Sequence, residues 1–369
     1  MRLLNVKTLK LEEFHKDTPK YGILSHRWNE EEVTYRDITE DRAMIRKFKA
    51  WPKIISCCRI AASRGFQYVW IDSCCIDKSS SAELTESINS MYLWYEQAEE
   101  CYAFLSDVNS FRDFGNSAWF TRGWTLQELI APTNVRFYNG QWKYLGSKAD
   151  MSDLLYGITK INANVLRSKA DLPHYSIAQR MSWAAHRQTS RPEDEAYCLL
   201  GIFKVNMPML YGEGENAFRR LQEEIIKQSD DQTLFAWHDE REEKPVLAPS
   251  PSCFADLHDL RCIYPTNDTR FGHTLSNSGL AIKLMLIPWT MNTYVAPLSC
   301  GRVLTKGPQT QQTSVRGYER LGIFLRQTQY ANHLVRVSVN GEDTIMLNSD
   351  IVASKRDTMA IKDRQIFLR

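Results

Sequence analysis

The segment YGILSHRW, residues 21–28, joins an apolar run to a polar end. The apolar half has the length and composition of a buried β-strand, and Ser25 to Trp28 would form its end. Similar runs follow at FQYVWID (66–72) and CYAFLSDV (101–108), with a fourth candidate at NVRFY (134–138). The first part of the chain is therefore predicted to contain several short, buried strands.

Helical patterns separate these strands. Residues 51–63 carry apolar side chains at helical spacing, and Ser79 to Ser81 offer N-caps for a helix whose apolar face includes Leu84, Ile88 and Met91. Strands that alternate with helices predict an α/β fold, with a parallel sheet flanked by helices on both faces. In such sheets ligands bind beyond the carboxyl ends of the strands.

The pattern changes further along the chain. Residues 150–240 look mainly helical, and beyond 245 the apolar residues alternate with period two, as in antiparallel strands. There Asn340-Gly341 predicts a type I′ hairpin turn. We therefore predict an α/β domain over 1–145, a helical extension over 146–244 and a small C-terminal antiparallel β module over 245–369.

Composition excludes several classes of function. The 46 basic and 44 acidic side chains leave a net charge of +2, which gives no electrostatic footprint for nucleic acid. No apolar run approaches the roughly 18 residues that a membrane span needs. The N-terminus meets charged residues too early for a secretory signal. We therefore expect a cytoplasmic protein without a membrane span.

The nine cysteines support an intracellular location. They include the neighbouring pairs Cys57–Cys58 and Cys74–Cys75, and they show no C-x-x-C spacing. Reduced, buried thiols are the favoured interpretation. Cys253, His258 and Cys262 lack a convincing fourth ligand, so no metal site is expected.

The strongest candidate for chemistry is WTLQEL, residues 124–129. If this segment is helical, Trp124 and Glu128 lie on one face at positions i and i+4. A carboxylate beside an indole is partly desolvated, which raises its pKa and its value in stabilising a cation. The alternative is an ordinary amphipathic helix with Leu126 and Leu129 in the core and Glu128 in solvent.

Two strand ends supply further candidates. Ser25, His26, Arg27 and Trp28 suit an anionic ligand that carries a ring, with Arg27 on phosphate and Trp28 stacking. Alternatively they form a polar cap on the strand. Asp72 and Asp77 flank the end of the next strand, where they either hold ribose hydroxyls or cap the loop and the following helix.

Two other motifs are interpreted as structural. Residues 212–217 fit the dinucleotide pattern G-x-G-x-x-A, but the segment before them is a poor strand and two glutamates lie in the loop, so a turn and helix start is favoured. The charged group Arg187, Arg191, Glu193, Asp194 and Glu195 is interpreted as a buried or interfacial ion network.

Three blocks of this sequence resemble the fungal heterokaryon incompatibility (HET) domain. They are GILSHRWNEEEVTY (22–35), the stretch from YVWIDSCC to CYAFLSDV (68–108), and WFTRGWTLQELIAP (119–132). The HET domain is itself regarded as a distant relative of TIR domains. Here ILSHRW is similar to the first TIR strand, and Trp124 to Leu129 is similar to the TIR motif Trp-Cys-Leu-x-Glu-Leu.

The resemblance implies a TIR-like (flavodoxin-like) fold and a role in fungal allorecognition and cell death. The glutamate of the TIR motif is catalytic in NAD cleavage, so Glu128 would be the catalytic residue. Trp124 would shape the pocket, Arg27 and Ser25 would hold phosphate, and His26 would contact the ligand. NAD would be the substrate, and no cofactor is required.

The resemblance also implies partners and a different class of function. Many TIR relatives are adaptors, so the alternative is a non-catalytic signalling domain that acts by self-association. On either interpretation we expect a homo-oligomer on activation, and a protein partner in an incompatibility pair. A nucleotide-binding sensor without turnover is a third interpretation.

Overall fold

The computed structural model describes most of the chain, in ten ranges. These are residues 1–28, 31–40, 47–167, 172–241, 243–263, 273–277, 279–303, 318–330, 333–347 and 362–368. The chain forms two compact units. The first comprises Met1–Leu172 and Arg187–Gly212, and the second comprises Pro173–His186 and Glu213–Arg369. The predicted boundaries at 145 and 244 stay predictions.

The first unit contains a seven-stranded sheet in the order β2-β1-β4-β3-β5-β6-β7. The strands are β1 (Arg2–Asn5), β2 (Leu11–Glu13), β3 (Tyr21–His26), β4 (Tyr68–Trp70), β5 (Glu100–Leu105), β6 (Val135–Asn139) and β7 (Tyr144–Ser147). All four strands predicted from the sequence are present as β3 to β6. Every residue of β3 and β5 is buried, as expected for central strands.

The predicted parallel sheet forms the centre, and antiparallel strands that were not predicted lie at its edges. The central strands β4, β3, β5 and β6 are parallel, whereas β1, β2 and β7 pair antiparallel. Short connections join β1 to β2 and β6 to β7, and a short connection can only join antiparallel neighbours. In chain order the four parallel strands run 2-1-3-4, which is how the flavodoxin-like order begins.

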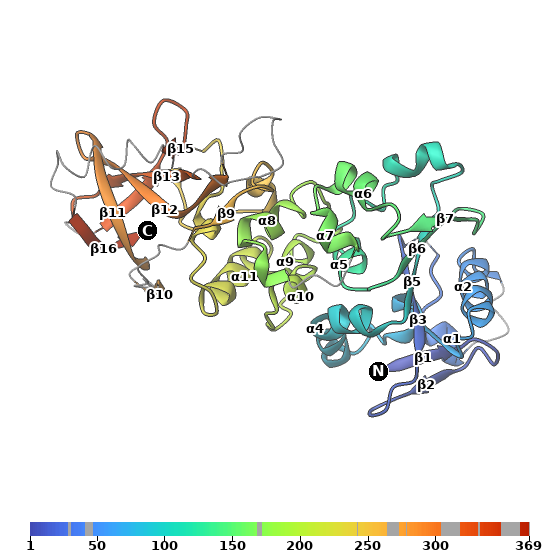
Figure 1. Ribbon diagram of the computed structural model, residues 1–369. Helices are drawn as coiled ribbons and strands as arrows, with labels where there is room; N and C mark the ends of the chain where they lie inside the picture. Colours follow the sequence, from blue (N-terminus) through green and yellow to red (C-terminus); the bar gives the residue numbers. More distant parts are fainter. Residues whose placement is uncertain are drawn as a thin grey trace. The chain divides into compact units, whose positions relative to one another are not determined.

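Helices cover both faces of this sheet, with α2 (Trp51–Ser63) on one side and α4 (Ser81–Gln97) on the other (Figure 1). The predicted helix over 51–63 is confirmed. The predicted cap is also confirmed, because the Ser80 side chain accepts from the Glu83 backbone N–H. The shorter helices are α1 (Tyr35–Glu40), α3 (Asp72–Cys75), α5 (Thr125–Ile130), α6 (Ser152–Thr159), α7 (Ala163–Arg167), α9 (Asp194–Tyr197) and α10 (Leu200–Phe203).

The second unit is built on a nine-stranded sheet, with α8 (Ile177–Ser182) and α11 (Asn216–Ile226) as its helices among the described residues. The strands are β8 (Glu243–Lys244), β9 (Arg261–Cys262), β10 (Thr274–Ser276), β11 (Gly279–Thr290), β12 (Thr293–Val303), β13 (Tyr318–Gln327), β14 (His333–Val337), β15 (Thr344–Leu347) and β16 (Lys362–Leu368). Its pairings are antiparallel except between β14 and β16.

Two predicted turns have the expected backbone. Asn340 and Gly341 have φ values of 55° and 83°, as a type I′ turn requires. Gly212 and Gly214 also have positive φ and lead into α11, as expected for a turn and helix start.

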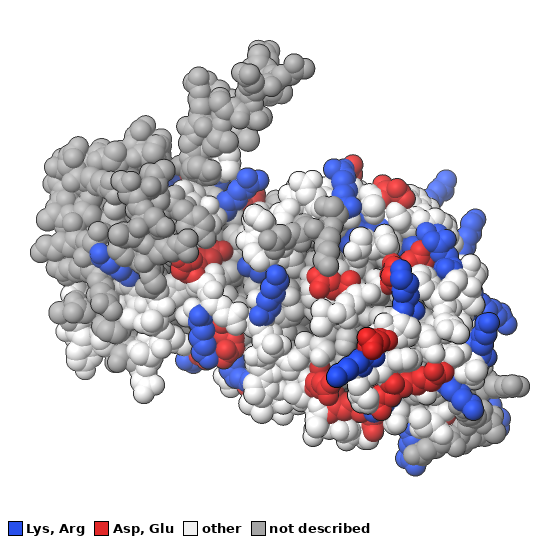
Figure 2. Space-filling model, turned by 60° about the horizontal axis from the view of Figure 1, so that its bottom comes forward, with Lys and Arg blue, Asp and Glu red and all other residues white. Residues whose placement is uncertain are grey.

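Charges of both signs are mixed on the surface. Figure 2 shows Lys and Arg side chains interspersed with Asp and Glu on the face that it displays. This mixing matches the near balance of 46 basic and 44 acidic residues. Among the described residues, no helix is long and apolar enough to cross a membrane.

Candidate active site

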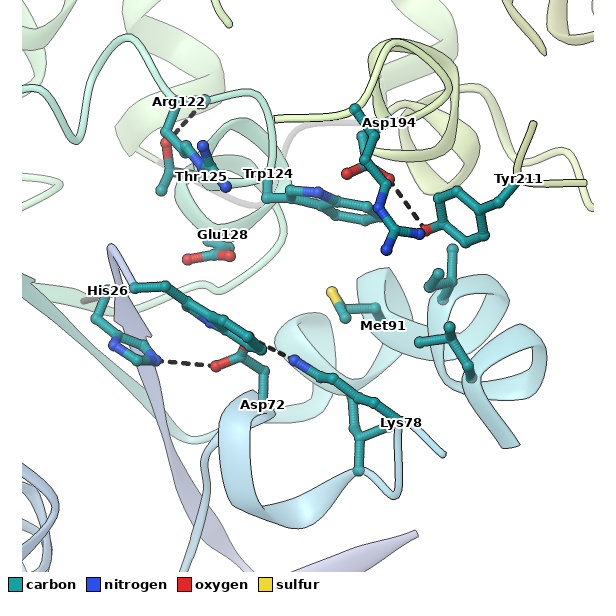
Figure 3. Close-up of a pocket in the computed structure, with 15 residues that line it drawn as sticks. His26, Asp72, Lys78, Met91, Arg122, Trp124, Thr125, Glu128, Asp194 and Tyr211 are labelled. Atoms are coloured by element: carbon teal, nitrogen blue, oxygen red, sulfur yellow. Dashed lines mark hydrogen bonds and ion pairs between the residues drawn. The ribbon is translucent and has the colours of Figure 1, made fainter. Parts of the chain in front are cut away.

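A pocket of about 290 Å³ lies in the first unit, beyond the carboxyl ends of β3 and β4 (Figure 3). This volume is close to the lower end of the roughly 300–1,000 Å³ range of small-molecule sites. Its apolar lining comes from Ile76, Leu84, Ile88 and Met91. Its polar and aromatic lining comes from His26, Trp28, Asp72, Lys78, Arg122, Trp124, Thr125, Glu128, Arg191, Asp194 and Tyr211. Its position at the end of β3 is where an α/β sheet binds ligands.

Glu128 lies in the wall of this pocket, and its residue is only 7% exposed. Burial raises the pKa of the Glu128 carboxyl to about 8, and the negative charge of Asp72 raises it further. A hydrogen bond from the Ser25 hydroxyl opposes this rise. The interpretation of Glu128 as a solvated residue on an amphipathic helix is therefore wrong. All six residues of α5 are buried.

Ser25 lies behind Glu128 and does not line the pocket. Its residue is fully buried, and its hydroxyl donates to Glu128 Oε2. The same hydroxyl accepts a hydrogen bond of 2.9 Å from the Trp119 indole N–H. Ser25 therefore orients the carboxyl group of Glu128 from the end of β3.

A half-buried arginine and a buried lysine donate hydrogen bonds at the two ends of α5. Arg187 Nη1 donates to the Arg122 carbonyl at 2.8 Å and to Thr125 Oγ1 at 2.9 Å, at the start of the helix. Lys148 Nζ donates to the carbonyls of Leu129 and Pro132, at its end. Burial lowers the pKa of Lys148 to about 8. The short helix that carries Glu128 is thus fixed at both ends.

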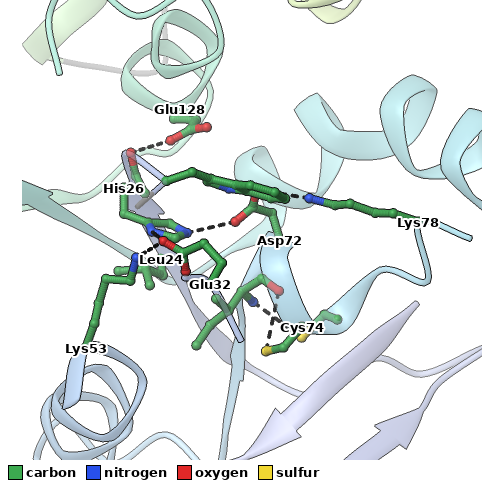
Figure 4. Close-up of polar contacts among 12 residues, drawn as sticks. Leu24, His26, Glu32, Lys53, Asp72, Cys74, Lys78 and Glu128 are labelled. Carbon is green, nitrogen blue, oxygen red and sulfur yellow. Dashed lines mark hydrogen bonds and ion pairs between the residues drawn. The ribbon is translucent and has the colours of Figure 1, made fainter. Parts of the chain in front are cut away.

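Asp72 connects three pocket residues (Figure 4). His26 Nε2 lies 2.9 Å from Asp72 Oδ1, and the Trp28 indole N–H donates to Oδ2 at 2.7 Å. Lys78 Nζ is 3.9 Å from Oδ2 and 3.3 Å from the centre of the Trp28 ring. Burial raises the pKa of Asp72, but Lys78 together with the hydrogen bonds from His26 and Trp28 brings it well below its usual range. Asp72 is therefore ionised beside Glu128.

His26 lies between two carboxylates. On the side away from Asp72, its Nδ1 is 3.9 Å from Glu32 Oε1, and Lys53 Nζ donates to the same oxygen (Figure 4). Burial lowers the pKa of Lys53, and Glu32 opposes this effect. The imidazole therefore has a fixed orientation at the base of the pocket.

Trp124, Asp194 and Tyr211 form the opposite wall (Figure 3). The Tyr211 hydroxyl donates to Asp194 Oδ1 at 3.0 Å, and the Arg191 guanidinium lies 4.5 Å from the centre of the Tyr211 ring. Burial raises the pKa of Asp194, and hydrogen bonds from Tyr211 and Trp124 oppose this. The interpretation of Arg191 and Asp194 as an ion network alone is thus incomplete, because both line the pocket.

The structure brings five of the eight candidate residues together in the pocket lining. These are His26, Trp28, Asp72, Trp124 and Glu128. Arg27 is exposed and Asp77 partly exposed, and neither lines the pocket. The Asp77 carboxylate instead accepts from the backbone N–H and hydroxyl of Ser79, which is the loop-capping alternative.

Sequence reasoning missed Lys78, Arg122 and Tyr211 as pocket residues. Lys78 lies a few residues after Asp72 at the end of β4, and Arg122 lies two residues before Trp124. Both are therefore close in sequence to residues that were predicted to form the site. Tyr211 had none. Among the described residues, no three or more His, Cys, Asp or Glu side chains gather as metal ligands.

Part of the chain that forms the pocket is similar to a known family. Residues 21–114 match the family described as heterokaryon incompatibility protein (HET). This region is similar to the HET domain. The match includes β3, β4 and β5, and it ends before Trp124 and Glu128. Residues 216–285 match a family described as a domain of unknown function, DUF8212.

One curated relative extends the HET similarity. The vegetative incompatibility protein HET-E-1 of Podospora anserina is 44% identical over 223 residues, which cover 57% of this chain. The match covers 16% of that relative, so this chain spans a small part of its length. No solved structure matches the chain significantly, and the TIR-like fold stays a prediction.

Proposed function

We propose that this protein acts in fungal vegetative incompatibility as a cell-death effector that cleaves NAD at the nicotinamide–ribose bond. The similarity to the HET domain and to a vegetative incompatibility protein supports the biological role. The resemblance of residues 124–129 to the catalytic TIR motif supports the reaction. The observation that carries the proposal is a buried glutamate, Glu128, in the wall of a ligand-sized pocket.

Cleavage of the nicotinamide–ribose bond is favoured by a carboxylate near the ribose. When the bond between nicotinamide and C1′ of the ribose breaks, the electron pair leaves with nicotinamide and the ribose becomes oxocarbenium-like. Glu128 stabilises this cation electrostatically or attacks C1′ as a transient nucleophile. The oxygen of a water molecule then bonds to C1′, and a proton is released. The products are nicotinamide and ADP-ribose.

A glutamate with a pKa of about 8 is mostly protonated at neutral pH. The nicotinamide ring of NAD carries a positive charge, and a positive charge nearby favours the ionised carboxylate. Substrate binding therefore lowers the pKa of Glu128 and expels its proton. The acid becomes a charged catalyst only when the cationic ring is present.

The pocket also offers surfaces for the ring itself. The Trp28 indole N–H is tied to Asp72, and the Trp124 indole is hydrogen-bonded to Asp194. Both tryptophans line the pocket. Because aromatic faces attract cations, they suit the nicotinamide end of the substrate.

The test is incubation of the purified full chain with NAD, followed by chromatography of nicotinamide and ADP-ribose. Glu128→Gln removes the charge with little change of shape, and we expect it to abolish turnover. Glu86→Gln, at an exposed position on α4, is the matched control and is expected to retain turnover.

Full turnover by Glu128→Gln would refute the catalytic role. Absence of product from well-folded protein at high concentration would refute NAD cleavage and favour the adaptor interpretation. A concentration-dependent increase in molecular mass, measured on the same samples, would then support self-association.

A further inference from the structure

Positive charge gathers at one end of the pocket. Its lining contains the cations Lys78, Arg122 and Arg191 and the carboxyl groups of Asp72, Asp194 and Glu128. Lys78 lies 3.9 Å from Asp72, so these two charges offset each other. Arg122 and Arg191 both lie close enough to lower the pKa of a single carboxylate, Asp194, so positive charge is in excess at this end of the pocket.

This end of the pocket is preorganised. Arg191 stacks 4.5 Å above the Tyr211 ring, and the Tyr211 hydroxyl is bonded to Asp194. Arg122 Nη1 donates to Ser190 Oγ at 2.9 Å. Stacking leaves the donor edge of a guanidinium open, and each guanidinium has five N–H donors. Both arginines are thus oriented while most of their hydrogen-bonding capacity remains for a ligand.

The two arginines lie away from the Asp72 end of the pocket. Figure 3 shows Arg122 and Asp194 on the side of Trp124, with Asp72 and Lys78 on the opposite side. Glu128 lies on the wall between Arg122 and His26 in this view. One ligand in this pocket therefore meets a carboxylate on one part of its length and guanidinium groups on another.

We propose that Arg122 and Arg191 form a subsite for phosphate groups, and that it holds the diphosphate of the dinucleotide. The inference rests on the proposed function for the identity of the ligand, and it assigns to these residues the role predicted for Arg27. The fork of a guanidinium matches two phosphate oxygens. The arginines would attract the anionic diphosphate and Glu128 would attract the cationic nicotinamide ring. The two ends of the ligand would therefore bind in opposite parts of the pocket.

The test measures binding without turnover. Glu128→Gln is the background, and calorimetry follows the binding of ADP-ribose and, separately, of inorganic pyrophosphate. Adding Arg191→Gln or Arg122→Gln is expected to weaken ADP-ribose binding about tenfold or more, since each removes a charge-assisted hydrogen bond. Arg59→Gln, at an exposed position on α2, is the matched control and should change nothing.

A phosphate-free ligand separates this subsite from a general loss of the pocket. Nicotinamide riboside is expected to bind equally well with and without Arg191→Gln. Unchanged ADP-ribose binding in both arginine variants would overturn the proposal, and so would a loss caused by Arg27→Gln instead. If ADP-ribose binding depends on the arginines while the unmutated chain fails to cleave NAD, the subsite stands and the proposed reaction fails.

Discussion

The hydroxyl of Ser25 donates a hydrogen bond to the carboxyl group of Glu128, 103 positions away in the sequence. It thereby connects the end of a central strand to the short helix that carries the proposed catalyst. The same oxygen accepts from the Trp119 indole, so one buried hydroxyl serves two partners. The ionisation of Glu128 consequently depends on a residue that does not touch the ligand pocket.

Replacing Ser25 by alanine should raise the pKa of Glu128 further, because the hydrogen bond that opposes the rise is lost. It should also destabilise the fold by about 1–3 kcal/mol, since the Trp119 N–H loses its acceptor. Urea unfolding and the pH dependence of NAD turnover measure the two effects. Ser25→Thr retains the hydroxyl and is the control. An unchanged pH profile in a folded Ser25→Ala variant would contradict the role given to this bond.

The pH dependence of NAD cleavage should follow the ionisation of Glu128. Below about pH 8, kcat/KM is expected to rise about tenfold per pH unit, because the free protein must lose the Glu128 proton before the bond to C1′ is cleaved. Above that pH it should level off. The plateau of kcat should begin at lower pH, because the bound cationic ring lowers the pKa. A flat kcat/KM between pH 6 and 9 would contradict this assignment.

Glu128 should also make the stability of the protein depend on pH. Its pKa is about 8 in the folded state and 4.5 in the reference state, so between these values the folded protein binds more protons than the unfolded chain. The contribution of Glu128 to stability is therefore present at low pH and is lost as pH rises toward about 8. The slope is at most about 1.4 kcal/mol per pH unit. Glu128→Gln should remove this decline, which chemical denaturation at pH 5 and pH 8.5 would detect. If stability fell equally between pH 5 and pH 8.5 in the unmutated protein and in Glu128→Gln, the role of Glu128 in this pH dependence would be refuted.

The packing of α10 against α4 depends on Gly201. A Cβ atom there would lie 2.0 Å from the Cβ of Tyr92, so the two helices would have to separate. Gly201→Ala is expected to destabilise the protein by about 1–3 kcal/mol. Gly157→Ala, in α6 with open space around it, is the matched control and should stabilise by about 0.5–1 kcal/mol. Thermal unfolding of both variants measures the difference, and equal effects would contradict the close approach.

Local sequence signals predicted the central elements of the first unit. The strands β3 to β6 are apolar runs of the right length, and α2 and α4 have helical apolar spacing. The edge strands β1, β2 and β7 were missed because they are three or four residues long and lack a continuous apolar run. The parallel pairing of β14 with β16 joins distant segments, and no local pattern encodes it.

The candidate site was predicted where its residues share a motif. Trp124 and Glu128 are one helical turn apart, so their common location follows from spacing alone. Tertiary packing brings Arg191, Asp194 and Tyr211 to the pocket. Their sequence shows two charged residues and a tyrosine, but nothing in it indicates that they lie near Glu128. Arg27 had the right chemistry at the right strand end, but its residue is exposed and lies outside the pocket lining.

The first unit is discontinuous in sequence, since residues 173–186 belong to the other unit. A ribosome therefore releases Glu128 well before Arg191 and Tyr211, and a stretch of the second unit emerges between them. Until that later segment arrives, a nascent chain has Glu128 and Asp72 but lacks the pocket wall that contains Arg191, Asp194 and Tyr211. The proposed site for NAD is therefore complete only after synthesis has passed Tyr211, so its activity would begin late in translation.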